Sequence, residues 1–320
     1  MGPGSDASST ILRFGRFTSA IRRFTQRCAL VEDSYGHGWQ KDLATWIRDE
    51  AAQLIDAWRG EIDAVTTLAD PLAFGVLERL LGQPVPELLP LVHRFSRYDE
   101  RRYRRPSETP LECFQDAERE VWTLLRALVA DRIASPRDDV PSRLLATGRL
   151  DYRDLMYTLR FVIQSTYQTS ALAIAACVDI VARAGEQLRS LPLDATARAA
   201  DEVLRVSSPV IRFARHVVTD TTLGDIPLRA GQRVVMFFPS ANHDERVFED
   251  PLRIDLARAE NPHVAFGAGI HTCLGAPIAR LHLTAVLDAL RGLELQRVQP
   301  GRCYASSVNN GCDQVLVRRL

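Results

Sequence analysis

The sequence predicts a mainly α-helical fold with a small β region. Between Gln40 and Ala184, apolar residues recur at spacings of three and four, which is the period of amphipathic helices. After Arg205 the pattern changes to short β-rich runs bounded by glycine and proline. With 46% hydrophobic and 25% charged residues in a chain of 320, the composition excludes a disordered or low-complexity protein.

The elements follow in order along the chain. Glycine, proline and charged residues separate predicted helices over residues 40–58, 71–81, 86–98, 110–133 and 152–184. The arginine-rich stretch 101–109 is interpreted as a solvated connector to which no chemistry is assigned. Runs 210–217 and 233–239 predict neighbouring strands of a small sheet, followed by coil, a last helix over 276–290 and irregular strands.

Charge and cysteine usage narrow the functional classes. The 40 basic and 40 acidic residues balance, so no overall field attracts nucleic acid or a membrane surface, and neither partner is expected. The six cysteines lack paired zinc-ribbon or redox spacings, and the chain shows no signal peptide or membrane span. We therefore expect a cytoplasmic protein. Residues 1–5, Met-Gly-Pro-Gly-Ser, are typical of a cloning scar.

The strongest motif lies just before the last predicted helix. Residues 266–275 read Phe-Gly-Ala-Gly-Ile-His-Thr-Cys-Leu-Gly. A cysteine at this position faces unpaired backbone N–H groups and the positive end of the helix dipole, which favour a thiolate. The flanking glycines permit close approach to a flat macrocycle. Thr272 breaks a dinucleotide-binding pattern, while a zinc site using His271 and Cys273 stays open as an alternative.

These residues resemble the Phe-x-x-Gly-x-His-x-Cys-x-Gly signature of the cytochrome P450 family. The resemblance implies one P450-like domain over residues 6–320, with a helical part over about 10–207 and a β-rich, haem-loop part over about 208–320. It implies haem b, with Cys273 as the metal ligand that favours O–O cleavage. It further implies that His271 donates to a haem propionate, Phe266 packs beside the sulfur, and Gly267 belongs to the cofactor loop.

A second element resembles the family's Glu-x-x-Arg motif. Glu202 and Arg205 match it, and Pro209 and Arg215 follow in family-like order. The resemblance implies an ion-pair network behind the haem loop and a propionate-binding role for Arg215. Glu186 and Arg189 also fit the short pattern, and for such a pair a helix-surface ion pair is the alternative interpretation.

The long predicted helix resembles the family's distal helix. Residues 165–169, Ser-Thr-Tyr-Gln-Thr, stand where the family has Ala-Gly-x-(Asp/Glu)-Thr, a distorted segment that relays protons. Thr169 is retained, Gln168 replaces the acid, and Thr166 is a possible substitute donor. Because an amide cannot deliver a proton as an acid does, the usual relay is in question. The alternative is a polar helix face whose hydroxyls bond to the preceding turn.

The start of the chain resembles the family least. Arg22 is a possible second propionate ligand, although it could instead be solvated beside Arg23 and Arg27. The family's first helices, two strands and the loop over the substrate pocket are missing, so the resemblance implies an N-terminally truncated fold. An open sheet edge and uncovered apolar surface would follow, which a homodimer partner, a second subunit or a carrier-bound substrate could cover.

Three functional hypotheses follow from the motifs. The first is a monooxygenase that oxidises a small natural-product intermediate with dioxygen and electrons from a ferredoxin docked on basic residues near Arg22. The second is haem chemistry without monooxygenation, such as peroxide use, dehydration, rearrangement or cyclisation, motivated by Gln168. The third is a haem-free helper protein, against which the intact Cys273, His271 and Arg215 argue.

Overall fold

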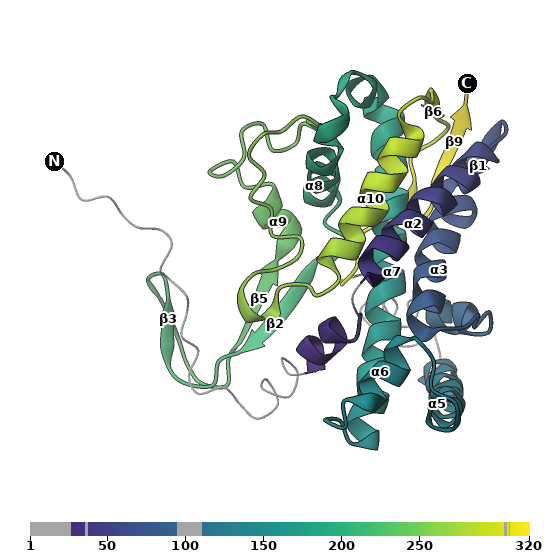
Figure 1. The fold of residues 1–320 in the computed structure, drawn as a ribbon. Helices are drawn as coiled ribbons and strands as arrows, with labels where there is room; N and C mark the ends of the chain where they lie inside the picture. The colour runs from purple at the N-terminus through teal and green to yellow at the C-terminus, as the bar shows by residue number, and fades with distance from the viewer. Residues whose placement is uncertain (1–26, 36–37, 95–110, 304–305, 307) are drawn as a thin grey trace.

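The computed structural model describes residues 27–35, 38–94, 111–303, 306 and 308–320, without the side chains of 111–114 (Figure 1). Residues 27–33 and 88–94 are helical. The other α-helices in the described part are α2 (Trp39–Asp56), α3 (Asp70–Leu81), α5 (Leu111–Ala134), α6 (Val140–Ala146), α7 (Tyr152–Ser190), α8 (Thr196–Ser207), α9 (Phe238–Asn242) and α10 (Ala276–Leu290). Single turns are η1 (Val65–Ala69), η2 (Leu193–Ala195) and η3 (Gly269–His271). The expected mainly α fold is confirmed.

The observed helices agree closely with the periodicity, with physical reasons for the differences. The last helix begins and ends as predicted, at 276 and 290. The long helix continues past its predicted end, although Ala184 departs from helical geometry there (φ −130°, ψ 23°). Helix α6 was not predicted because its seven residues are too few for a period, yet the Asp139 carboxylate caps it by accepting from the Ser142 N–H.

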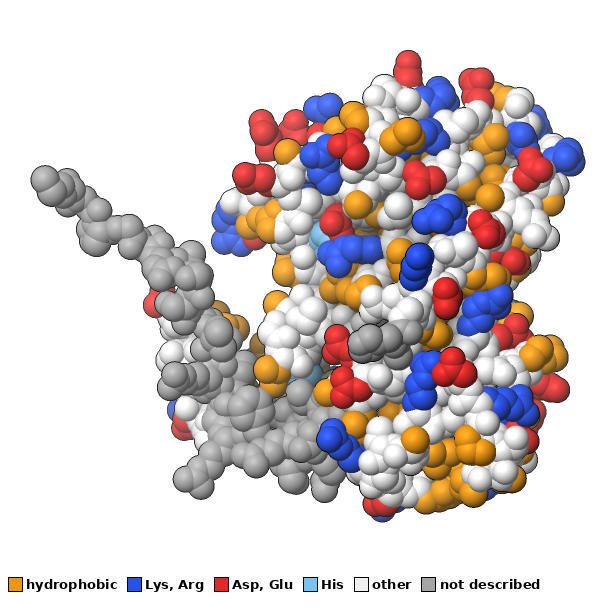
Figure 2. Space-filling view, in the orientation of Figure 1, with side chains coloured by type: hydrophobic (Ala, Val, Ile, Leu, Met, Phe, Trp, Pro, Cys, Tyr) orange, Lys and Arg blue, Asp and Glu red, His pale blue; other side chains and the backbone are white. Residues whose placement is uncertain are grey.

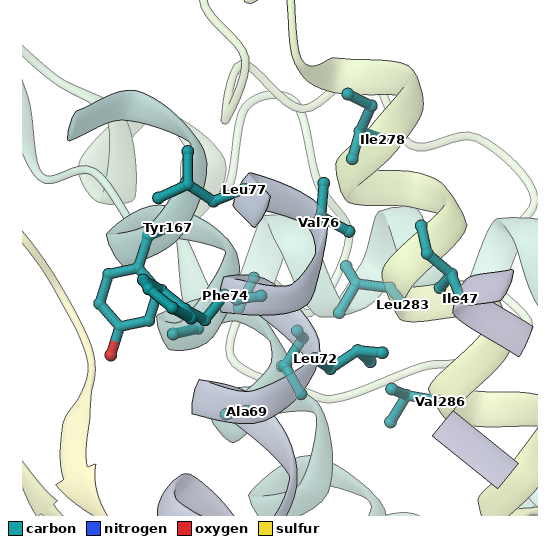
Figure 3. Close-up of a cluster of buried hydrophobic side chains, with 14 of the residues drawn as sticks. Ile47, Ala69, Leu72, Phe74, Val76, Leu77, Tyr167, Ile278, Leu283 and Val286 are labelled. Carbon is teal, nitrogen blue, oxygen red and sulfur yellow. The ribbon is translucent and has the colours of Figure 1, made fainter. Parts of the chain in front are cut away.

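The core forms where α3 and α10 pack against the long helix α7 and α2 packs against α10. Figure 3 shows Leu72 and Val76 of α3 on the side that faces Leu283 and Val286 of α10, and all four side chains are fully buried. Helices α2 and α3 approach closely at Gly75, where a Cβ would lie 2.5 Å from Trp46 Cη2. This packing accounts for the apolar spacing in the helical part of the sequence.

The strands form small antiparallel sheets. Strands β2 (Arg212–His216) and β5 (Arg233–Phe237) pair with Arg212 opposite Phe237, which confirms the predicted neighbouring strands. Strands β3 (Thr221–Leu223) and β4 (Ile226–Leu228) form a hairpin that extends away from the helical body (Figure 1). Strands β7 (Arg302–Cys303) and β8 (Cys312–Gln314) form another pair.

A further sheet joins segments that are far apart in the sequence. Its order is β1 (Glu61–Asp63), β9 (Leu316–Arg319) and β6 (Leu295–Arg297). Strand β1 lies within the part predicted as helical. Its three residues are too short to show alternation, and its partner in β9 is supplied only by the folded chain.

The surface carries mixed charge. On the face shown in Figure 2, acidic and basic side chains are interspersed, without a large patch of either sign. None of the helices in the described part is sufficiently long and apolar to span a membrane. A surface cavity of about 480 Å³ lies beside the start of α7, with Arg27, Leu30, Arg149 and Asp154 in its walls. No candidate site residue lines this cavity.

Candidate functional site

The loop before α10 is closed by backbone hydrogen bonds. The Cys273 N–H donates to the Phe266 carbonyl (2.9 Å), and the Gly267 N–H donates to the Val264 carbonyl (2.9 Å). Gly267 (φ 68°) and Gly269 (φ 72°) adopt left-handed conformations that favour glycine. The motif glycines therefore form the turns that place Cys273 directly ahead of the helix.

Cys273 is exposed, and its sulfur lies at the N-terminus of α10. Desolvation by the surrounding loop raises the pKa of this thiol, while hydrogen bonds from the Gly275 and Ala276 N–H groups and the charge of Arg280 lower it. The net direction is upward, so the helix end does not by itself produce the expected thiolate. It does supply donors directed at the sulfur, an arrangement suited to holding a thiolate bound to a metal.

The Phe266 ring lies beside this loop, next to the side chains of Arg280 and His263. The Arg280 guanidinium carbon lies 4.8 Å from the ring centroid, and the His263 ring lies 5.8 Å from it. Asp201 of α8 accepts from Arg280 Nε (2.8 Å) and bonds to His263 Nε2 (3.2 Å). The sequence reasoning assigned no role to Asp201, His263 or Arg280, because their side chains come together only in the folded chain.

Arg215 and His271 form the basic side of the site. Burial, followed by the charge of Arg215, lowers the pKa of His271, so β2 and η3 bring these side chains near one another. Arg215 donates to its neighbouring Ala214 carbonyl (3.1 Å) and forms no ion pair with any carboxylate in the described part of the chain. A half-buried cation in this position suits an anionic group on a ligand.

Arg22 lies outside the described residues, so its predicted role is not tested. Arg27, which belongs to the same basic segment, forms an ion pair with Asp154 at the start of α7. Within the basic segment proposed to dock a ferredoxin, this arginine is therefore already neutralised.

Glu202 and Arg205 form the expected ion-pair network. Both side chains are fully buried, and Arg205 donates to the Glu202 carboxylate through Nε and Nη2 at 2.8 Å each. Arg258 (3.1 Å) and Asn261 (3.1 Å) also donate to Glu202. Both buried charges of this pair therefore have partners, which is the condition for keeping an ion pair in a protein interior.

This network connects to the cysteine loop through Asn242. Arg205 Nη1 donates to the Asn242 carbonyl (2.9 Å), and the Asn242 Oδ1 accepts from the Val264 N–H (2.7 Å). Val264 in turn accepts from Gly267 at the start of the loop. The Glu-x-x-Arg pair thus positions the segment that carries Cys273.

The α7 segment differs from what the resemblance implies. Residues 165–169 stay helical, since Ala184 is the residue with non-helical angles inside α7, so the expected local distortion is absent from this described segment. The Thr169 hydroxyl donates to the Ser165 carbonyl (2.9 Å), as in the alternative interpretation of a polar helix face. Thr166 is half-buried. The Gln168 Nε2 is buried and has no hydrogen-bond partner among the described residues.

The sequence analysis did not predict a partly buried polar network that includes Tyr167, the residue before Gln168. The Tyr167 hydroxyl donates to Asp70 Oδ1 (2.6 Å) and also bonds to His93 Nε2 (2.5 Å). Burial raises the pKa of Asp70, while the Tyr167 bond and the charge of His93 lower it. Tyr167, among the polar residues of the long helix, was the sequence feature that could have indicated this network. Its partners Asp70 and His93 lie on other elements, far away in the sequence.

Comparison with known proteins agrees with these motifs. The cytochrome P450 family model matches residues 187–297. The steroid C26-monooxygenase of Mycobacterium tuberculosis is 32% identical over 273 residues, covering 82% of this chain and 73% of the relative. The chain belongs to the cytochrome P450 family. The cyclomarin C epoxidase of Salinispora arenicola is 33% identical over 258 residues, covering 75% of this chain.

The fold comparison extends over most of the chain. A cytochrome P450 of Mycobacterium marinum, solved in complex with pseudoionone, superposes with a TM-score of 0.84 at 26% identity. The match covers 92% of this chain and 75% of that one. The chain spans 63% of the length of the cyclomarin C epoxidase, so it matches less than two thirds of that P450.

The residues present fit the haem that this family implies. Cys273 offers an exposed sulfur with backbone donors, and Arg215 offers a cation without a carboxylate partner in the described chain. Gly267 and Gly269 keep the loop free of side chains on their Cα atoms. Among the described residues, no three His, Cys, Asp or Glu side chains group as ligands for a metal ion.

Proposed function

We propose that this chain is a haem-thiolate oxidoreductase that oxidises a small organic molecule. The exposed Cys273 sulfur, at the N-terminus of α10 with the Gly275 and Ala276 N–H groups directed at it, is the observation that carries the proposal. In this proposal Cys273 holds haem b, and haem bound there supplies the activation of dioxygen or peroxide.

The neighbouring residues bind and orient the cofactor. Arg215, with His271 beside it, would hold the propionates by charge-assisted hydrogen bonds. Phe266, fixed between His263 and Arg280, would pack beside the sulfur and exclude water from it. The Glu202–Arg205 network would keep the loop in place before and after cofactor binding.

We propose a natural-product biosynthetic intermediate as substrate, oxidised with dioxygen and electrons from a ferredoxin. The names of the related cyclomarin C epoxidase and steroid C26-monooxygenase describe oxidations of organic small molecules. The family relationship supports an oxygen-dependent reaction of this kind, and the substrate is identified only by class.

A second candidate reaction is favoured by the α7 segment. Gln168 carries no acidic proton, and the Thr169 hydroxyl is engaged with the Ser165 carbonyl. In this arrangement Gln168 and Thr169 do not relay protons to a ligand as the family's pair of an acidic residue and a threonine does. Peroxide use, dehydration, rearrangement or cyclisation at the haem would need less proton delivery, which supports this alternative.

The carbon-monoxide difference spectrum of the reduced, haem-loaded protein tests the proposed ligand. We expect the absorption typical of a thiolate-bound haem, lost in Cys273→Ala and kept in the matched control Cys303→Ser, which alters another exposed cysteine. Retention of that absorption in Cys273→Ala would exclude Cys273 as the ligand. Absence of bound haem in the wild-type protein would support a haem-free helper function instead.

The oxidant is tested by comparing substrate turnover under matched conditions. Ferredoxin with its reductase and NADPH is supplied in one reaction, hydrogen peroxide in another, and neither in a third. Product in the first reaction alone supports the monooxygenase. Product without external electrons supports the second candidate.

A further inference from the structure

Two cysteines face one another across the β7–β8 pair. Arg302 lies opposite Gln314, and Cys303 lies opposite Cys312, so Asp313 is the extra residue of a β-bulge. In a regular antiparallel pair the residue opposite Cys303 would be Asp313. The bulge therefore replaces a carboxylate with a thiol as the cross-strand partner of Cys303.

The cross-strand register of this pair is compatible with a disulfide. Directly opposed residues in antiparallel strands have Cα atoms about 4.5–5.5 Å apart, which lies within the span of disulfide-bonded cysteines. Both cysteines are free thiols, and Cys303 is close enough to help raise the pKa of Cys312. A Cβ on Gly301 would lie 2.8 Å from the Cys312 sulfur, so glycine at this position leaves room for that sulfur.

The two thiols differ in access. Cys303 is exposed, and its sulfur donates to the Gly301 carbonyl (3.5 Å). Cys312 is half-buried, and burial, followed by the neighbouring Cys303 thiol, raises its pKa to about 12. An incoming reagent therefore reaches Cys303 first, while Cys312 is poised beside it as a second thiol.

We propose that Cys303 and Cys312 form a thiol–disulfide exchange site for low-molecular-weight disulfides of the glutathione type. The Cys303 thiolate attacks one sulfur of the small disulfide, whose S–S bond breaks to release one small thiol and leave a mixed disulfide. Cys312 then attacks the Cys303 sulfur and displaces the second small thiol. One small disulfide and two protein thiols thus give one protein disulfide and two small thiols.

The bridge would act on a strand that contacts the distal helix. A Cβ on Gly311 would lie 2.6 Å from Leu172 Cδ2 of α7, three residues beyond Thr169. On the other side, Asn310 donates its N–H to the Pro209 carbonyl (2.8 Å) and its amide to the Ser207 carbonyl (2.6 Å). Joining β7 to β8 would restrain this segment between α7 and the end of α8.

Mass spectrometry of the haem-loaded full chain tests the proposal. After incubation with oxidised glutathione, acid quench and alkylation, we expect a Cys303–Cys312 cross-linked peptide that lacks two hydrogens and returns to the thiols with dithiothreitol. Cys312→Ser should accumulate one glutathione at Cys303. In Cys303→Ser, glutathione addition at Cys312 should be at least ~10-fold slower, because a raised thiol pKa leaves little thiolate.

Two further measurements separate exchange chemistry from misfolding. Far-ultraviolet circular dichroism and the haem spectrum should be the same for both serine variants and the wild type. Gly301→Ala, which displaces the Cys312 sulfur, should slow the cross-link while leaving glutathione addition at Cys303 unchanged. A wild-type protein that stops at the mixed disulfide, bridges other cysteines, or shows equal addition in both serine variants would overturn the proposal.

Discussion

Gln168 is the side chain that most directly separates the two candidate reactions. Its buried amide nitrogen has no partner in the described chain, and it stands where the family has an acid. We expect Gln168→Glu to raise ferredoxin-driven turnover about tenfold, because a carboxylic acid can donate a proton that an amide cannot. Peroxide-driven turnover should stay unchanged, and Gln168→Leu serves as the control without a polar group. Equal loss of both activities in Gln168→Glu would contradict this role.

Arg215 is expected to contribute to haem retention through its charge. A charge-assisted hydrogen bond is worth about 1.5–3 kcal/mol, so Arg215→Gln should weaken haem affinity by about tenfold or more. Arg233→Gln alters an exposed arginine on the paired strand β5 and should leave the affinity unchanged. The rate of haem transfer to apomyoglobin measures haem retention in both variants. Similar transfer rates for the two variants would show that Arg215 makes no specific contact with the cofactor.

Helix α10 contains a buried histidine that makes stability depend on pH. Burial lowers the pKa of His282 to about 4, and both ring nitrogens are buried without a hydrogen-bond partner among the described residues. In the unfolded chain the pKa is near 6.5, so the unfolded state binds the proton more tightly. The free energy of unfolding is therefore greatest above that pH and falls as the pH decreases toward 4, by about 1.4 kcal/mol per unit.

Urea unfolding at pH 7 and pH 5 measures this dependence. His282 should account for about 2 kcal/mol of the difference in free energy of unfolding between these pH values. His282→Leu removes the titrating group and should reduce the pH dependence by that amount. An unchanged difference in this variant would show that other groups are responsible.

Helix α8 connects the core to the cysteine loop through one buried ion pair. Arg205→Lys cannot reproduce the paired hydrogen bonds to Glu202 and should reduce the free energy of unfolding by about 3 kcal/mol. Arg189→Lys is the matched control, since Glu186 and Arg189 have the same spacing but are exposed. That control should change stability by less than about 0.5 kcal/mol. Denaturant titrations measure both variants. An equal loss of unfolding free energy in Arg205→Lys and Arg189→Lys would show that burial of the ion pair does not cause the difference.

At the scale of the whole molecule, the β1–β9–β6 sheet joins residues near 61 to the end of the described chain. Val317 in the central strand is fully buried, whereas Arg318 is exposed and pairs with Glu61 at 3.2 Å. Val317→Ala should lower the free energy of unfolding by about 2 kcal/mol, and Arg318→Ala by less than about 1 kcal/mol. Denaturant titration compares them. A larger loss in Arg318→Ala would indicate that the sheet is stabilised mainly by surface charge.

The accuracy of the sequence predictions depended on how local the signal was. Helix α10 was predicted with its observed bounds, because apolar periodicity and the preceding glycine motif act within one segment. The β2–β5 pairing was also predicted, since glycine and proline bound two β-rich runs close in sequence. Strand β1 and the Asp70–Tyr167–His93 network were missed, because β9 and Tyr167 lie 74 or more residues from the segments that they contact.

Local pattern alone was enough to establish the mainly helical fold, the family and the cysteine loop, because these depend on neighbouring residues and a short motif. Folding was needed to show that Glu202 and Arg205 are buried while Glu186 and Arg189 are exposed. It was also needed to show that a bulge at Asp313 places Cys303 opposite Cys312. The physical reason is that burial and cross-strand register depend on distant segments, whose packing no single stretch of sequence encodes.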